Sequence, residues 1–88
     1  MIMEQQYDFE INFAKIHPSF TSNLSKAVPN LTSREIKISM YLRLSYESKQ
    51  IQNQLEISHS TYFNACSSIR KKLKLKRNES LTNKILAL

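Results

Sequence analysis

No glycine occurs anywhere in this chain of 88 residues. Tight hairpin turns use glycine because it adopts positive φ angles without steric cost, and phosphate-binding loops use it for close backbone approach. The glycine-rich fingerprints of dinucleotide-binding and P-loop proteins therefore cannot be present. No segment shows the alternation of apolar and polar residues that a strand requires. We expect an all-α fold.

Short helical patterns follow one another along the chain, separated by caps and prolines. The expected helices cover residues 8–15, 18–27, 33–44, 49–55 and 59–74, with a last helix after Asn78. The spacing of Phe9, Phe13 and Ile16 puts these side chains on one helical face. The first helix is expected to end at His17, because a residue before proline is pushed out of the helical region.

The third expected helix has the clearest start signal. Thr32 is a good N-cap, and Glu35 follows three residues later, which completes a capping box. Leu31 and Ile36 are spaced for a hydrophobic staple across the same helix start. The expected helices 49–55 and 59–74 are separated by a three-residue turn, which is typical of a helix-turn-helix.

Positive charge is concentrated in the second half of the chain. The formal net charge is +6, and residues 45–88 contain eight basic and three acidic side chains against five and four in residues 1–44. Six of those eight basic side chains lie between Arg70 and Arg77. A basic cluster at one end of a small domain is typical of proteins that bind nucleic acid, although a solvated charged face gives the same pattern.

Several functional classes have little support in the sequence. His17, His59 and Cys66 do not form a metal-ligand pattern, and no nucleophile with a positioned base is visible. We expect neither an enzyme nor a bound cofactor, metal or small-molecule ligand. No apolar run approaches the ~20 residues of a membrane span, and the first residues do not resemble a signal peptide. The single cysteine suits a reducing compartment, so we expect a cytoplasmic protein.

From Leu31 onward the chain resembles the LuxR/GerE-type helix-turn-helix domain of bacterial regulators. The motifs that carry this resemblance are Leu31-Thr32-x-Arg34-Glu35, Ser48-Lys49-Gln50-Ile51, Leu55-x-Ile57-Ser58-x-Ser60-Thr61 and Ile69-Arg70-Lys71-Lys72-Leu73-x-Leu75. Upstream, the pattern from Phe9 to Thr32 resembles the segment that precedes such domains in many regulators of Bacteroidetes-type bacteria. In those regulators the domain is usually the C-terminal effector domain of a longer protein.

The resemblance implies a small helical bundle that contains a tetrahelical helix-turn-helix with two extra N-terminal helices. Residues 1–30 would form a helical extension packed on the core, and residues 31–88 the helix-turn-helix, as one compact unit. The implied function is sequence-specific binding of double-stranded DNA in transcription regulation, with RNA polymerase as a further expected partner. Family members dimerise through the last helix, and Leu81 and Ile85 are the candidates for that interface here.

The expected recognition helix, 59–74, has an inward apolar line and an outward polar face. The inward line consists of Tyr62, Cys66, Ile69 and Leu73. The candidate DNA-binding residues are Lys49, Ser60, Thr61, Phe63, Asn64, Ser67, Arg70, Lys71, Lys74 and Lys76. Asn64 can form a bidentate pair with adenine, and Phe63 can lie against a thymine methyl group.

The remaining candidates are expected to hold phosphates. Ser60, Thr61 and Lys49 lie near helix starts, where backbone N–H groups also favour anions. Further non-specific attraction, by counterion release, would come from the basic residues Lys71, Lys72, Lys74, Lys76 and Arg77.

Two alternatives stay open. One is the promoter-reading domain of a sigma factor, which uses a similar arrangement of helices. The other is a protein-interaction module that kept the fold and lost DNA binding. Phe63, Cys66 and Ser68 favour the second alternative, because relatives tend to carry charged residues at these positions.

Overall fold

The computed structural model describes the backbone of residues 2–88 and the side chains of residues 9–88. The helices are α1 (Ile2–Ile16), α2 (Pro18–Ala27), α3 (Ser33–Arg43), α4 (Ser48–Leu55), α5 (His59–Lys72) and α6 (Leu81–Ala87). Residues 2–88 contain no strand, so the expected all-α bundle is confirmed. No helix among the described residues is both long enough and apolar enough to cross a membrane.

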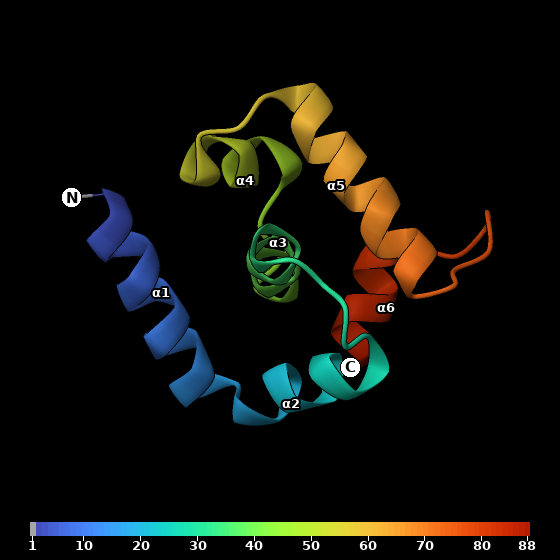
Figure 1. Cartoon of the computed structure of the whole chain (residues 1–88), viewed down its shortest axis with the longest axis horizontal. Helices are drawn as coiled ribbons and strands as arrows, with labels where there is room; N and C mark the ends of the chain where they lie inside the picture. The colour runs from blue at the N-terminus through green and yellow to red at the C-terminus, as the bar shows by residue number, and fades with distance from the viewer. Residues whose placement is uncertain (1) are drawn as a thin grey trace.

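Helix α3 runs through the middle of the molecule, where the other helices surround it (Figure 1). Its residues from Ile38 to Leu42 are buried without interruption, including the polar Ser39. The Ser39 hydroxyl donates to the Glu35 carbonyl oxygen at 2.9 Å, which satisfies a polar group that burial would otherwise penalise. Ile38, Tyr41 and Leu42 all belong to the core, and the helix has no broad solvent face.

The capping box at the start of α3 forms as the sequence predicts. The Glu35 N–H donates to Thr32 Oγ1 at 3.2 Å, and the Thr32 N–H donates to Glu35 Oε1 at 2.9 Å. Leu31 and Ile36 are both partly buried against the core, as a hydrophobic staple requires. These local contacts fix where the central helix begins.

The two N-terminal helices share one hydrophobic core with the rest of the bundle. Phe13 and Phe20 meet edge to face at 5.5 Å between ring centroids, and both belong to the same buried cluster as Ile38. Phe9 stacks on Tyr41 at 4.2 Å, which joins α1 to α3. Aromatic side chains thus attach α1 and α2 to the central helix.

Helix α1 ends at His17 as predicted, but its start and one of its faces differ from the prediction. It begins at Ile2 rather than residue 8, since residues 2–7 include Met, Glu and Gln, which favour helix without needing an apolar stripe. Ile16, expected on the inward face, is 70% exposed. The helix ends directly after it at His17, and Pro18 starts α2, whose Phe20 packs against Phe13 instead.

Three helices end in a left-handed residue that is not glycine. Ser45, Glu56 and Lys74 have φ angles of 65°, 54° and 56°. After Lys74, for example, the Leu75 N–H donates to the Arg70 carbonyl at 3.1 Å, and the Lys74 N–H donates to the Lys71 carbonyl at 3.0 Å. This is the Schellman pattern, which usually places glycine at the left-handed position.

The end of α5 and the start of α6 also correct the sequence prediction. Helix α5 ends at Lys72 rather than Lys74, because the Schellman turn reverses the chain there. Ser80, and not Asn78, caps α6: the Asn83 N–H donates to Ser80 Oγ at 3.2 Å. The connection between the two helices is therefore longer than expected.

Helix α6 packs against α3 through the residues that were candidates for a dimer interface. Ile85 is 0% exposed and Leu81 is 9% exposed, and both belong to the core. Both side chains are buried within the chain itself, and the expected dimer interface through Leu81 and Ile85 stays an untested prediction. The spacing of Leu81 and Ile85 along the sequence fits a buried core face and a dimer contact equally well.

Candidate nucleic-acid interface

Helices α4 and α5 are joined by the short turn that the sequence predicts. Ile51 of α4 is fully buried, and α4 packs against α5. Ser58 caps α5, since its Oγ accepts from the Thr61 N–H at 3.1 Å and donates to Thr61 Oγ1 at 2.9 Å. Ser60 Oγ lies 3.3 Å from Ser58 Oγ. The hydroxyls at the start of α5 thus form one connected group that faces solvent.

One stripe of α5 is polar and exposed along its whole length. Ser60, Asn64, Ser67 and Lys71 follow one another at helical spacing, and all are exposed. On the opposite side, Tyr62 and Ile69 are buried, while Cys66 and Leu73 are half-buried. The expected inward line is therefore confirmed, and the stripe is the outward face that it implies.

Phe63 lies beside this stripe and is 50% exposed. Its ring contacts His59 at a centroid distance of 4.4 Å and Tyr62 at 5.9 Å. These neighbours hold the ring while leaving half of it in water. An exposed aromatic side chain offers an apolar contact to a base methyl group or to a protein.

The basic end of the surface is formed by cations that have no partner among residues 9–88. Lys71, Lys74, Lys76 and Arg77 are all exposed. Among residues 9–88 their side chains make no hydrogen bond or ion pair with another residue. Lys49, at the start of α4, is likewise exposed. Unpaired cations on one surface are free to attract a polyanion.

Arg70 has a structural role instead. Its guanidinium donates to the Glu79 carbonyl oxygen at 2.7 Å and to the Lys76 carbonyl oxygen at 2.8 Å. The Glu79 carboxylate accepts from the Lys76 N–H at 2.8 Å, which closes the loop on itself. Arg70 therefore holds the α5–α6 connection, and its expected contact with DNA stays a prediction.

Lys72 is also withdrawn from the basic surface. Its Nζ lies 2.7 Å from Glu35 Oε1 and donates to the Asn30 carbonyl at 3.0 Å. Burial by itself would raise the pKa of Glu35. Hydrogen bonds from Lys72, Ser68 and the Thr32 backbone, with the charge of Lys72, outweigh that cost and lower this pKa from 4.5 to about 2. Lys72 thus contributes to folding rather than to counterion release.

Tyr62 and Cys66 lie one helical turn apart, on the side of α5 that faces the core. Burial raises the pKa of the Tyr62 hydroxyl, and the contact with Cys66 adds to this effect. Burial likewise raises the pKa of the Cys66 thiol, partly offset by the hydrogen bond from Tyr62. A thiol with a raised pKa is a poor nucleophile at neutral pH.

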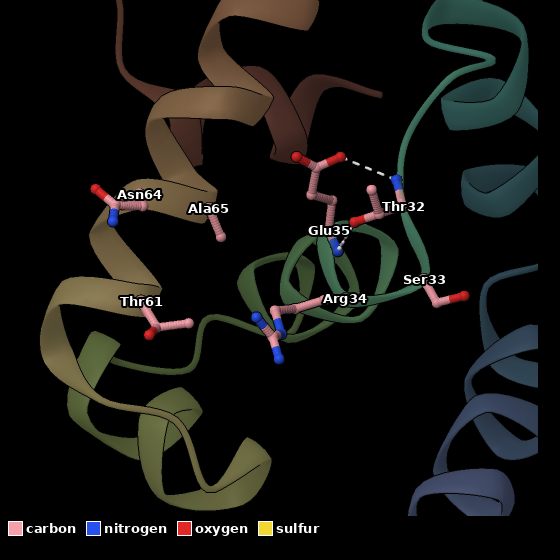
Figure 2. A pocket seen from close by; sticks show the side chains of 7 residues that line it. All are labelled: Thr32, Ser33, Arg34, Glu35, Thr61, Asn64 and Ala65. Atoms are coloured by element: carbon pink, nitrogen blue, oxygen red, sulfur yellow. Dashed lines mark hydrogen bonds between the residues drawn. The ribbon is translucent and has the colours of Figure 1, made fainter.

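An open groove of about 650 Å³ separates the start of α3 from the flank of α5 (Figure 2). Its lining consists of Thr32, Ser33, Arg34, Glu35, Thr61, Asn64 and Ala65. Figure 2 shows Arg34 reaching from α3 toward the side of α5 that carries Thr61. Arg34 is not among the site residues expected from the sequence, because the local pattern around Thr32 indicates only a helix start.

No family model matches this chain, and no curated protein or solved structure is similar to it. Within residues 9–88, no three histidine, cysteine or acidic side chains gather in a way that could hold a metal ion.

Proposed function

We propose that this domain binds double-stranded DNA by placing α5 in the major groove. The observation that carries the proposal is the continuous exposed face of α5, which is polar in its first half and ends in unpaired cations. Ser60, Asn64 and Ser67 supply hydrogen-bonding groups, and Lys71 with Lys74 supplies charge. This division matches what a duplex offers, since base edges lie in the groove and phosphates line its walls.

The dimensions of α5 suit that role. The helix has 14 residues, which corresponds to a length of about 21 Å. A helix with its side chains is roughly 10–12 Å across, and the major groove is about 12 Å wide. The face that carries Ser60 and Asn64 can therefore approach base edges while the rest of the bundle stays outside the groove.

Transcription regulation follows from the resemblance to LuxR/GerE-type domains. The succession of α3, α4, α5 and α6 supports this reading, because that family uses a scaffold helix, a positioning helix, a recognition helix and a last helix in the same order. A cytoplasmic location, a second copy of the chain and RNA polymerase as a partner belong to the same proposal.

The test is fluorescence anisotropy of labelled duplex fragments from the source genome, titrated with protein at several salt concentrations. We expect binding that weakens steeply with salt and that prefers some fragments over others. Steep salt dependence without preference would leave only a non-specific binder. No binding at low salt would contradict the proposal.

The exposed ring of Phe63 favours a second candidate function, a protein-interaction module. Interfaces between proteins are enriched in aromatic side chains, and this ring is half exposed beside the polar stripe of α5. Substituting Phe63 with Ala separates the candidates. A DNA reader loses preference for particular fragments, whereas an interaction module keeps whatever DNA affinity it has.

A further inference from the structure

We infer that Arg34 binds a DNA phosphate, as an anchor beside the recognition helix and on a different element from it. This inference rests on the proposed function and adds a residue to it. Arg34 is exposed on α3, and it makes no hydrogen bond or ion pair with any other residue among those described. Its side chain lines the groove that Thr61 and Asn64 line from α5.

The position of the groove determines which part of the duplex would meet Arg34. A helix that fills the major groove has its flanks against the groove walls, and those walls are the sugar-phosphate backbones. Thr61 and Ala65 lie on the flank of α5 that faces the start of α3 (Figure 2). A side chain that stands beside this flank therefore meets the backbone of one strand and not the base edges.

The electrostatics of the groove are suited to an anion. Glu35 is the acidic side chain in the lining, and its charge is already balanced by Lys72 at 2.7 Å. The cation of Arg34 remains without such a partner. Guanidinium groups bind phosphate oxygens in a bidentate manner, and the nearby Thr61 hydroxyl can donate to the same phosphate.

Folding does not account for an arginine at this position. Arg34 is in the first turn of α3, where the partial positive charge of the helix N-terminus makes a cation unfavourable. Within the described part of the chain it forms no hydrogen bond or ion pair that would offset this cost. A ligand phosphate would offset it.

The experiment compares Arg34→Gln with Arg43→Gln on several labelled duplexes across a salt series. Arg43 is the matched control, since it removes the same charge from the other end of α3. For Arg34→Gln we expect the slope of log K against log salt to fall in magnitude by about 0.9, which is roughly an eightfold loss of affinity at 0.1 M salt. Arg43→Gln should leave the slope unchanged.

The outcomes distinguish this inference from the proposed function. If the unchanged protein binds DNA and Arg34→Gln keeps its slope, the inference is wrong and the proposed function stands. A loss that differs strongly among fragments would also overturn it, because a phosphate contact weakens binding to all sequences alike. If the unchanged protein binds no DNA, both fail. Circular dichroism of Arg34→Gln confirms that the variant is folded.

Discussion

Lys72 Nζ lies 2.7 Å from Glu35 Oε1, so the end of the proposed recognition helix is held by the start of the central helix. The two residues are separated by 37 positions in the sequence. Glu35 also completes the capping box with Thr32, and Ser68 donates a further hydrogen bond to it. One carboxylate therefore sets both where α3 begins and how α5 lies against it.

This relationship predicts that stability falls in acid. The pKa of Glu35 is lowered from 4.5 to about 2 in the folded protein, so the unfolded chain binds a proton more readily. The stabilisation is fully present above pH 4.5 and is lost as pH falls toward 2. Its size is roughly 3 kcal/mol, from 1.36 kcal/mol per unit of pKa. Urea unfolding followed between pH 7 and 2 measures it.

Glu35→Gln provides the control for that prediction. Glutamine at this position keeps the capping box, so the variant loses the ion pair but not the helix start. We expect lower stability at pH 7 and a weaker decline in acid than in the unchanged protein. An equally steep decline in the variant would assign the acid sensitivity to other carboxylates.

Arg70→Ala is predicted to loosen the α5–α6 connection. The guanidinium donates to the carbonyls of Lys76 and Glu79, and charged hydrogen bonds of this kind contribute about 1–2 kcal/mol when partly exposed. Amide hydrogen exchange at residues 76 and 79 should accelerate, with a matching loss of stability. The neighbouring Lys71→Ala is the control, because its side chain holds nothing in the fold. Equal effects of the two substitutions would count against the loop role of Arg70.

Glu56→Gly is predicted to stabilise the protein by ~0.5–1 kcal/mol. Glu56 has φ 54°, and a side chain in the left-handed region carries a steric cost that glycine avoids. For a domain of this size the midpoint of thermal unfolding should rise by a few degrees. Asn78→Gly, at a turn position without a positive φ, should give no such gain. A lower midpoint of thermal unfolding for Glu56→Gly would show that Glu56 carries no such steric cost.

Ile85→Ala is predicted to destabilise the fold rather than to separate a dimer. Its side chain is fully buried, and truncation of such a residue typically costs about 2–5 kcal/mol. The matched control is Leu86→Ala, since Leu86 is 41% exposed on the same helix. This substitution should lower the free energy of unfolding far less. Denaturant unfolding measures the loss of stability, and light scattering shows whether a dimer has dissociated. A stable Ile85→Ala monomer formed from a dimer would support the interface hypothesis.

Asn64→Ala and Lys71→Ala are predicted to weaken DNA binding in different ways. Both side chains are exposed on the same stripe of α5. Loss of a base contact at Asn64 should reduce preference for the best fragments, by about 1–3 kcal/mol, without changing the salt slope. Loss of Lys71 should weaken all fragments alike and lower the slope by about 0.9. Anisotropy with preferred and random duplexes measures both effects.

Much of the local structure could be predicted from the sequence. The capping box at Thr32, the cap at Ser58 and the break at His17 each depend on residues within one turn of one another. The inward line of α5 follows from periodicity in the same way. Such signals predicted the number of helices and most of their ends, because short-range geometry decides them.

The errors arose where a helix end or a contact depends on distant residues. Helix α5 stops at Lys72 because a Schellman turn forms without glycine, and the absence of glycine hid that signal. Ile16 follows the apolar spacing of α1 but is exposed, since the chain turns immediately after it. Arg34 was missed because its groove exists only when α3 and α5 are side by side.

By itself, the sequence determined an all-α fold, the order of the helices and a surplus of positive charge near the end of α5. Only the tertiary structure decided which of those charges are free. Lys71 faces solvent, while the adjacent Lys72 pairs with Glu35 and Arg70 holds the following loop. The physical reason is that neighbouring positions on a helix point in directions 100° apart, so what each side chain meets depends on the helices packed around it.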